Sequence, residues 1–300
     1  MKKKTYLFAL MAMVLTLGSC SDNENGIGGE TSKYITVSTS IGNMTRVATD
    51  EKGGQTFEEG DEISVYAWTG DATVAPETRE RVVNNAINKL TNGSWISNPQ
   101  MLWKNNRDKH YFIGVYPISA ISDLSAGEYT FDVNKQVESD LLVAVNKDGL
   151  SYNVDEQQPV PLTFTHVMAK LVVNLTYKNQ WGGIPTVEKV VVGNAAKEAT
   201  INYLTKVVTP SATAKEDFSL PEITENTKYV SVIIPQEEVT QLTIVIGGKN
   251  FVYDNGTPFK LESGKITTVN LEVGRDEIKL GDVKITNWED GSTFSGEALN

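Results

Sequence analysis

The chain has 300 residues, a net charge of -11, two histidines and one cysteine. The acidic balance argues against nucleic acid as a partner, because a negatively charged surface repels the phosphate backbone. A single cysteine excludes a disulfide within the chain, so burial of apolar side chains must stabilise the fold.

The first predicted element is an export signal at residues 1–19. Three lysines precede an apolar stretch from Tyr6 to Leu17 that is too short to span a bilayer, and small residues then lead to Cys20. This order resembles a bacterial lipoprotein signal, in which the thiol carries fatty acids such as palmitate and becomes the mature N-terminus. Cys20 is therefore the predicted lipidation site. Loss of the three lysines would take the net charge from -11 to -14. The alternative is a plain secretory signal followed by a chance cysteine.

The next segments are a predicted flexible tether at residues 20–33 and a strand at Tyr34–Ile41. The tether is rich in small polar residues and glycine, a composition typical of linkers. In the strand, apolar residues alternate with polar ones. We expect this strand to pair within a first β-sandwich and to bury Ile35, Val37 and Ile41.

The rest of the chain continues the same alternation, which predicts an all-β sandwich fold. Further alternating stretches lie at 63–67, 172–175, 230–234 and 266–271, and turn dipeptides lie at Asn92-Gly93, Asp148-Gly149, Gly247-Gly248, Asn255-Gly256 and Asp290-Gly291. One stretch differs, since Arg79 to Leu90 has the apolar spacing of a helix and contains no Pro or Gly. Its sequence leaves two alternatives open: a short helix, or a hairpin beginning near Asn85.

A domain boundary is predicted near Gln157 to Pro161, where two prolines interrupt the strand pattern. Proline cannot donate to a central ladder, so we expect the chain to leave one sheet there and enter another. The predicted domains are an N-terminal β-sandwich at 34–160 and a C-terminal β-sandwich at 161–300.

The sequence predicts no catalytic, metal-binding or cofactor-binding residue. His110 and His166 have no metal-ligand spacing. Four carboxylates surround Gly60 in a pattern typical of a solvated turn: Glu58, Glu59, Asp61 and Glu62. The five tryptophans could stack sugars, although in a sandwich such residues are more often core or edge packing.

Eight short motifs in order resemble those of Bacteroidetes fimbrillin-like proteins over essentially the whole chain after the signal. They are Thr45-Arg46, Phe57–Tyr66, Tyr111–Pro117, Asp140–Ala144, Leu162–Leu171, Ile233–Gln236, Leu261–Lys265 and Ile285–Trp288.

The resemblance implies a pilus subunit or adhesin built from two tandem transthyretin-like β-sandwich domains, without enzymatic activity. It implies a lipoprotein of the outer membrane, exposed at the cell surface or in the fimbrium and attached to the membrane only through its lipid. A trypsin-like protease would cut after Arg46 and leave Val47 as the new start. The first strand, with Ile35, Val37 and Ile41, would then be displaced by a strand from another pilus subunit. A surface receptor or glycan is a further implied partner.

Several alternatives stay open from the sequence. Arg46 could be an ordinary exposed arginine, and residues 276–300 could form a donor arm or complete the second domain. The protein could instead be a surface glycan-binding lipoprotein that does not polymerise. A hydrolase of surface polysaccharide is a third class, which would require two carboxylates facing each other across a sugar.

Overall fold

A computed structural model of the chain describes residues 33–42, 56–153, 158–275 and 278–288. The described residues form strands, loops and two three-residue 3-10 turns, Thr78–Glu80 and Asn179–Trp181, so the all-β fold class is confirmed. None of them forms a helix of the length and apolar character needed to cross a membrane.

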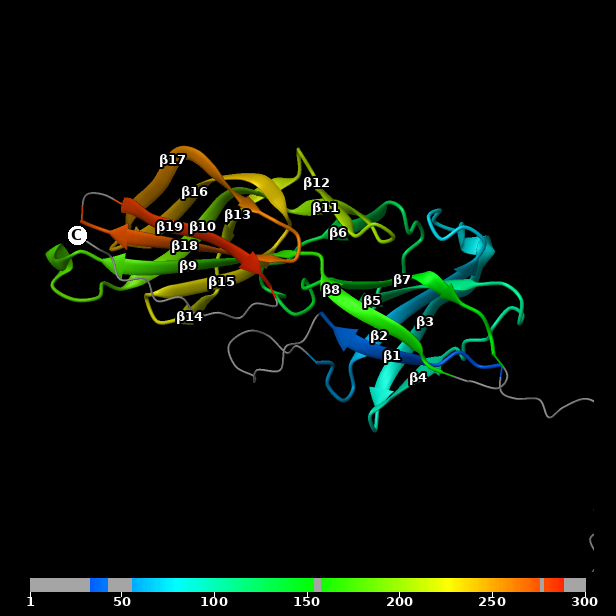
Figure 1. The fold of residues 1–300 in the computed structure, drawn as a ribbon. Helices are drawn as coiled ribbons and strands as arrows, with labels where there is room; N and C mark the ends of the chain where they lie inside the picture. Colours follow the sequence, from blue (N-terminus) through cyan, green and yellow to red (C-terminus); the bar gives the residue numbers. More distant parts are fainter. Residues whose placement is uncertain (1–32, 43–55, 154–157, 276–277, 289–300) are drawn as a thin grey trace, which may run out of the picture. The chain divides into compact units, whose positions relative to one another are not determined.

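The N-terminal half of the described chain contains a seven-stranded sheet with the order β1-β8-β7-β5-β2-β3-β4 (Figure 1). Its strands are β1 (Val37–Ile41), β2 (Glu62–Thr69), β3 (Arg81–Thr91), β4 (Ser94–Asn98), β5 (His110–Tyr116), β7 (Leu142–Leu150) and β8 (Val160–His166). One face covers an apolar cluster that contains Ile35, Val65 and Phe164, and the other face contributes Tyr66 and Trp68 to a second cluster. The middle of β2 is therefore buried on both faces.

The C-terminal half contains a four-stranded sheet, β13-β10-β16-β17, and a five-stranded sheet, β14-β15-β9-β18-β19, among the described residues. Their strands are β9 (Ala169–Tyr177), β10 (Val187–Ala196), β13 (Lys215–Ser219), β14 (Glu222–Thr224), β15 (Lys228–Ile233), β16 (Gln236–Ile246), β17 (Lys249–Leu261), β18 (Lys265–Val273) and β19 (Ile278–Asn287). Alternate side chains of β9, β10, β16 and β18 share one apolar core between these sheets. This arrangement is a β-sandwich.

A three-stranded sheet joins segments that are distant in sequence. Strand β6 (Gly127–Thr130) pairs with β11 (Glu198–Asn202), which pairs with β12 (Val207–Pro210). Ladder hydrogen bonds between β6 and β11 therefore connect the N-terminal half of the chain to the C-terminal half, in addition to apolar packing.

The predicted change of sheet near Gln157 to Pro161 lies too early in the chain. Strand β8 begins at Val160, contains Pro161 and pairs with both β7 and β1 of the first sheet. The next strand, β9, belongs to the five-stranded sheet, so the change comes after His166. The division into domains at 34–160 and 161–300 stays a prediction.

The stretch from Arg79 to Leu90 is mostly strand: Arg79 and Glu80 end a 3-10 turn, and Arg81 to Leu90 lie in a strand and not in an α-helix. Strand β3 begins at Arg81 and turns through Asn92-Gly93 into β4, so the hairpin alternative is correct, with a start four residues before Asn85.

Candidate functional site

Strand β1 lies at one edge of the seven-stranded sheet and pairs in parallel with β8. The register runs from Val37 opposite Val160 to Ile41 opposite Phe164, and the Gly42 N–H donates to the Phe164 carbonyl over 2.8 Å. Within the described residues β1 has no ladder partner on its other side. The sheet therefore holds β1 by hydrogen bonds along one side only.

The burial predicted for three side chains of this first segment is observed. Ile35, Val37 and Ile41 are 2%, 6% and 8% exposed, and all three belong to the apolar cluster beneath the sheet. Phe164 and Met101 are members of the same cluster. We call the apolar surface beneath β1, formed by the other members of this cluster, the β1 groove.

The residues just before β1 pair with a second segment of the chain. The Ile35 N–H donates to the Met101 carbonyl over 2.9 Å, and the Trp103 N–H donates to the Lys33 carbonyl over 3.0 Å. These two bonds hold the start of the strand in addition to its ladder with β8.

Thr39 is the one polar member of the inward-facing row of β1. Its Oγ1 accepts a hydrogen bond of 2.9 Å from Nε1 of Trp95, which lies on β4 at the other end of the sheet order. The sheet therefore curls so that its two edge strands meet (Figure 1). Sequence reasoning missed this contact, although a threonine in an otherwise apolar alternating row was a signal for it.

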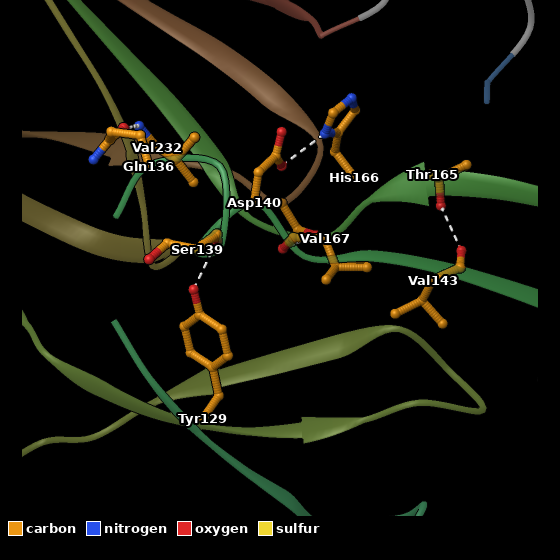
Figure 2. A network of polar contacts seen from close by, with 10 residues as sticks. Tyr129, Gln136, Ser139, Asp140, Val143, Thr165, His166, Val167 and Val232 are labelled. Carbon is orange, nitrogen blue, oxygen red and sulfur yellow. Dashed lines mark hydrogen bonds and ion pairs between the residues drawn. The ribbon is translucent and has the colours of Figure 1, made fainter. Parts of the chain in front are cut away.

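Strand β8, the ladder partner of β1, ends in a network of polar contacts (Figure 2). His166 Nδ1 lies 2.8 Å from Asp140 Oδ1, and the Val167 N–H donates to the Leu141 carbonyl over 3.0 Å. The His166 ring also stacks on Trp288, with ring centres 4.1 Å apart. These contacts do not involve β1.

Three predicted site residues, Cys20, Arg46 and Val47, lie outside the described residues. The described part of the C-terminal segment, strand β19, pairs antiparallel with β18 from Ile278 to Asn287. Its described residues therefore form the edge strand of the five-stranded sheet in this structure.

The two histidines make structural contacts. His166 pairs with Asp140 as described above, and both ring nitrogens of His110 are used, since Nε2 accepts from the Lys104 N–H over 3.1 Å and Nδ1 lies 3.0 Å from the Asp108 carbonyl. The carbonyl can only accept, so the proton lies on Nδ1 and the ring of His110 is neutral. Burial lowers the pKa of His110 below its ordinary value. In the described part of the chain, no three His, Cys, Asp or Glu side chains form a group suited to a metal ion.

The carboxylates at 58–61 serve the turn before β2. Asp61 Oδ2 accepts from the Glu58 N–H over 2.7 Å, and Glu59 Oε1 accepts from the Asn92 N–H over 2.8 Å. Gly60 between them has a φ of +97°. These bonds favour the turn interpretation over a pair of catalytic acids.

The tryptophans occupy separate surroundings. Trp68 and Trp288 are buried in the core, Trp103 packs edge-on against His110, and Trp181 packs against Phe251. No ring contact joins two tryptophans among the described residues. Their packing favours structural roles over a sugar-stacking row.

Comparison with solved structures supports the fold. A proposed cell adhesion protein of Bacteroides uniformis matches with a TM-score of 0.64 and 19% identity, over 86% of this chain and 100% of that one. A proposed cell adhesion protein of Bacteroides ovatus also has a TM-score of 0.64, with 17% identity over 85% and 98% of the two chains. The C-terminally truncated tip fimbrial protein Mfa3 of Porphyromonas gingivalis matches with a TM-score of 0.50 and 11% identity, over 77% and 95%.

Sequence comparison gives the family. A proposed fimbrium subunit of Bacteroides uniformis, Fim1C, is 24% identical over 315 aligned positions that cover 97% of each chain. Residues 45–288 match the profile of the family described as Fimbrillin-like, which is most of the chain and includes the β1 groove but not β1 itself. The chain therefore belongs to the fimbrillin-like family.

Proposed function

We propose that the protein is a non-enzymatic pilus subunit or adhesin of the cell surface, lipid-anchored through Cys20 in the outer membrane and assembled by strand exchange at the β1 groove. The observation that carries the proposal is the position of β1. It is an edge strand held along one side, it covers an apolar groove, and it ends five residues before Arg46.

In this proposal a trypsin-like protease cuts after Arg46, and Val47 becomes the first residue of the assembled subunit. The family match covers residues 45–288, so it includes the proposed cut site and the residues of the β1 groove.

The free energy of burying the side chains of this segment favours a protein in which β1 stays in place until the chain is cut. Ile35, Val37 and Ile41 each contribute about 1.5–3 kcal/mol when fully buried, which is a large part of the roughly 5–15 kcal/mol that holds an ordinary domain folded. Once cut, β1 loses its covalent link to the body, and a strand from another subunit can restore the same ladder and burial.

Peptide capture tests this function. Full-length protein nicked after Arg46 by a trypsin-like protease, with the cut site verified by mass, is mixed with a labelled peptide of residues 33–42. We expect the peptide to replace β1 in the nicked protein and to leave uncut protein unlabelled. A peptide with Ile35→Asp and Val37→Asp should not be captured, because two carboxylates would enter an apolar groove.

Arg46→Ala and a matched control address the cut itself. Arg46→Ala should leave a full-length, unassembled protein in cells, whereas Arg79→Ala, which changes an exposed arginine paired with Glu77, should mature normally. Normal assembly of Arg46→Ala, or nicked protein that ignores the wild-type peptide, would contradict the proposed function.

A further inference from the structure

The inward-facing row that begins at Ile35 and continues through β1 is chemically uneven. Ile35, Val37 and Ile41 are buried aliphatic residues, whereas Thr39, between the last two, is half-buried and bonded through Oγ1 to Trp95 Nε1. Any strand that replaces β1 meets the same indole N–H at the same place in the groove.

An apolar groove alone does not fix the register of an incoming strand. Side chains alternate with a period of two, so a slip of two residues keeps apolar side chains facing the groove. The backbone ladder of a parallel pair repeats with the same period, so it also permits that slip. A single polar contact within the row removes this ambiguity, because only one register brings an acceptor to the donor.

Trp95 is held in place by residues other than β1. Its ring packs edge-on against Phe57, with centres 5.3 Å apart, and Phe57 packs in the same way against Phe164 and Tyr116 at 5.1 Å and 5.4 Å. Phe57 follows Arg46 in the sequence, so it would stay in the chain after the proposed cut. The indole donor is therefore supported independently of the strand that it contacts.

We propose that Trp95 is a specificity-determining residue of the β1 groove, which selects a partner strand with a hydroxyl at its third inward position and sets that strand's register. The partner is a strand of another pilus subunit with the inward sequence apolar, apolar, Ser or Thr, apolar. This inference rests on the proposed strand exchange and adds the identity and place of the polar contact. The indole N–H can only donate, so an aliphatic side chain at this position leaves it without its partner.

The other hydroxyl contact of β1 does not serve this purpose. Ser40 Oγ donates to Thr163 Oγ1 over 3.2 Å on the exposed side of the strand, where water can replace either partner. The half-buried Thr39 contact, within the groove, is the one that an unsuited strand cannot reproduce.

Four peptides of residues 33–42 test the inference on nicked protein, with affinity followed by tryptophan fluorescence or calorimetry. They are the wild-type peptide, Thr39→Ser, Thr39→Val, and a peptide of unchanged composition in which Val37→Thr is combined with Thr39→Val. We expect wild-type and Thr39→Ser to bind alike, and Thr39→Val to bind about threefold to tenfold more weakly, the equivalent of one part-buried hydrogen bond. The peptide with exchanged residues should bind at least as weakly as Thr39→Val.

Trp95→Phe in the protein is the matched control, because it keeps an aromatic ring and removes the donor. In nicked Trp95→Phe protein the preference for the wild-type peptide over the Thr39→Val peptide should disappear. Equal capture of these two peptides by nicked protein that keeps Trp95 would overturn the inference, because a purely apolar groove accepts valine at least as well as threonine. That result would not contradict strand exchange. Persistence of the preference in Trp95→Phe would also overturn it. Capture of none of the peptides would contradict the proposed function itself.

Discussion

Phe164 lies over two unusually small neighbours in the sheet. The register places Ile41, Phe164, Ala144, Gly114 and Val65 side by side across five strands. A Cβ on Gly114 would lie 2.6 Å from Cζ of Phe164, so the absence of a side chain leaves room for the ring. The glycine therefore leaves space for Phe164, one of the residues that form the β1 groove.

Gly114→Ala should destabilise the protein and weaken capture of the 33–42 peptide. The added methyl group must push aside a fully buried ring, and such overpacking costs about 1–3 kcal/mol. Chemical denaturation measures the loss. Gly193→Ala is the control, because its Cβ would meet at 2.6 Å the end of the Gln241 side chain, which can turn away. Equal effects of the two substitutions would contradict this account of Gly114.

His110 should make folding stability depend on pH. Burial lowers its pKa in the folded protein, while in the unfolded chain it titrates near its ordinary value of 6.5. Below that value the unfolded state takes up a proton that the folded state excludes, so the free energy of unfolding falls as the pH is lowered from about 7.5 to 5. Denaturation at several pH values measures this slope.

His110→Gln separates this effect from other titrating groups. The variant loses stability at neutral pH, because the contacts with Lys104 and Asp108 change, but it should depend less on pH between about 7.5 and 5 than the wild type. A slope as steep as that of the wild type would show that His110 does not cause it.

At the level of elements, β3 shows why its spacing is typical of a helix. Asn85 has a φ of +54°, and the register with β2 shifts between Val65 and Ala67, which marks a bulge. Because of the extra residue, the successive buried positions Val83 and Ala86 are three residues apart and not two. The sequence pattern contains the bulge, but only the Asn92-Gly93 turn indicates that the segment is a strand.

Strand β8 shows how a proline enters an internal strand. The register of β7 with β8 covers Ala144 to Leu142 only, opposite Phe164 to His166, so β7 does not pair with Pro161. On the other side the Val160 N–H donates to the Thr36 carbonyl, and alternate residues of a parallel strand face each neighbour. The missing N–H of Pro161 therefore points away from β1, and the rule that proline ends a sheet does not apply here.

Alternation alone predicted a strand at Tyr34–Ile41, of which Val37–Ile41 forms β1, and it predicted the burial of Ile35, Val37 and Ile41, because a half-buried strand has a period of two. It did not predict the partner of that strand, since Val37 and Val160 are far apart in sequence and many strands share the pattern. The Thr39–Trp95 contact depends on the curl of the sheet, which no local pattern contains. Turn dipeptides were reliable at Gly247-Gly248, between β16 and β17, but Asp148-Gly149 lies within β7.

At the scale of the whole molecule, the contacts distinguish β1, which the proposed exchange would remove, from the body of the protein. The polar network at the end of β8, Phe57 and Trp95 all belong to the body of the protein, whereas β1 contributes an edge ladder and one row of side chains. In the proposed mechanism, loss of β1 would leave the β1 groove open. Its apolar surface and the indole N–H of Trp95 would then be available to a strand of another subunit.

The most direct test of this account is the N-terminal sequence and mass of the protein in assembled surface fibres. The account predicts subunits that begin at Val47 and lack residues 34–41, with the groove occupied by a strand of a neighbouring subunit. Unassembled precursor should begin at acylated Cys20. Fibres whose subunits retain Cys20 and the intact segment through Ile41 would contradict strand exchange at the β1 groove.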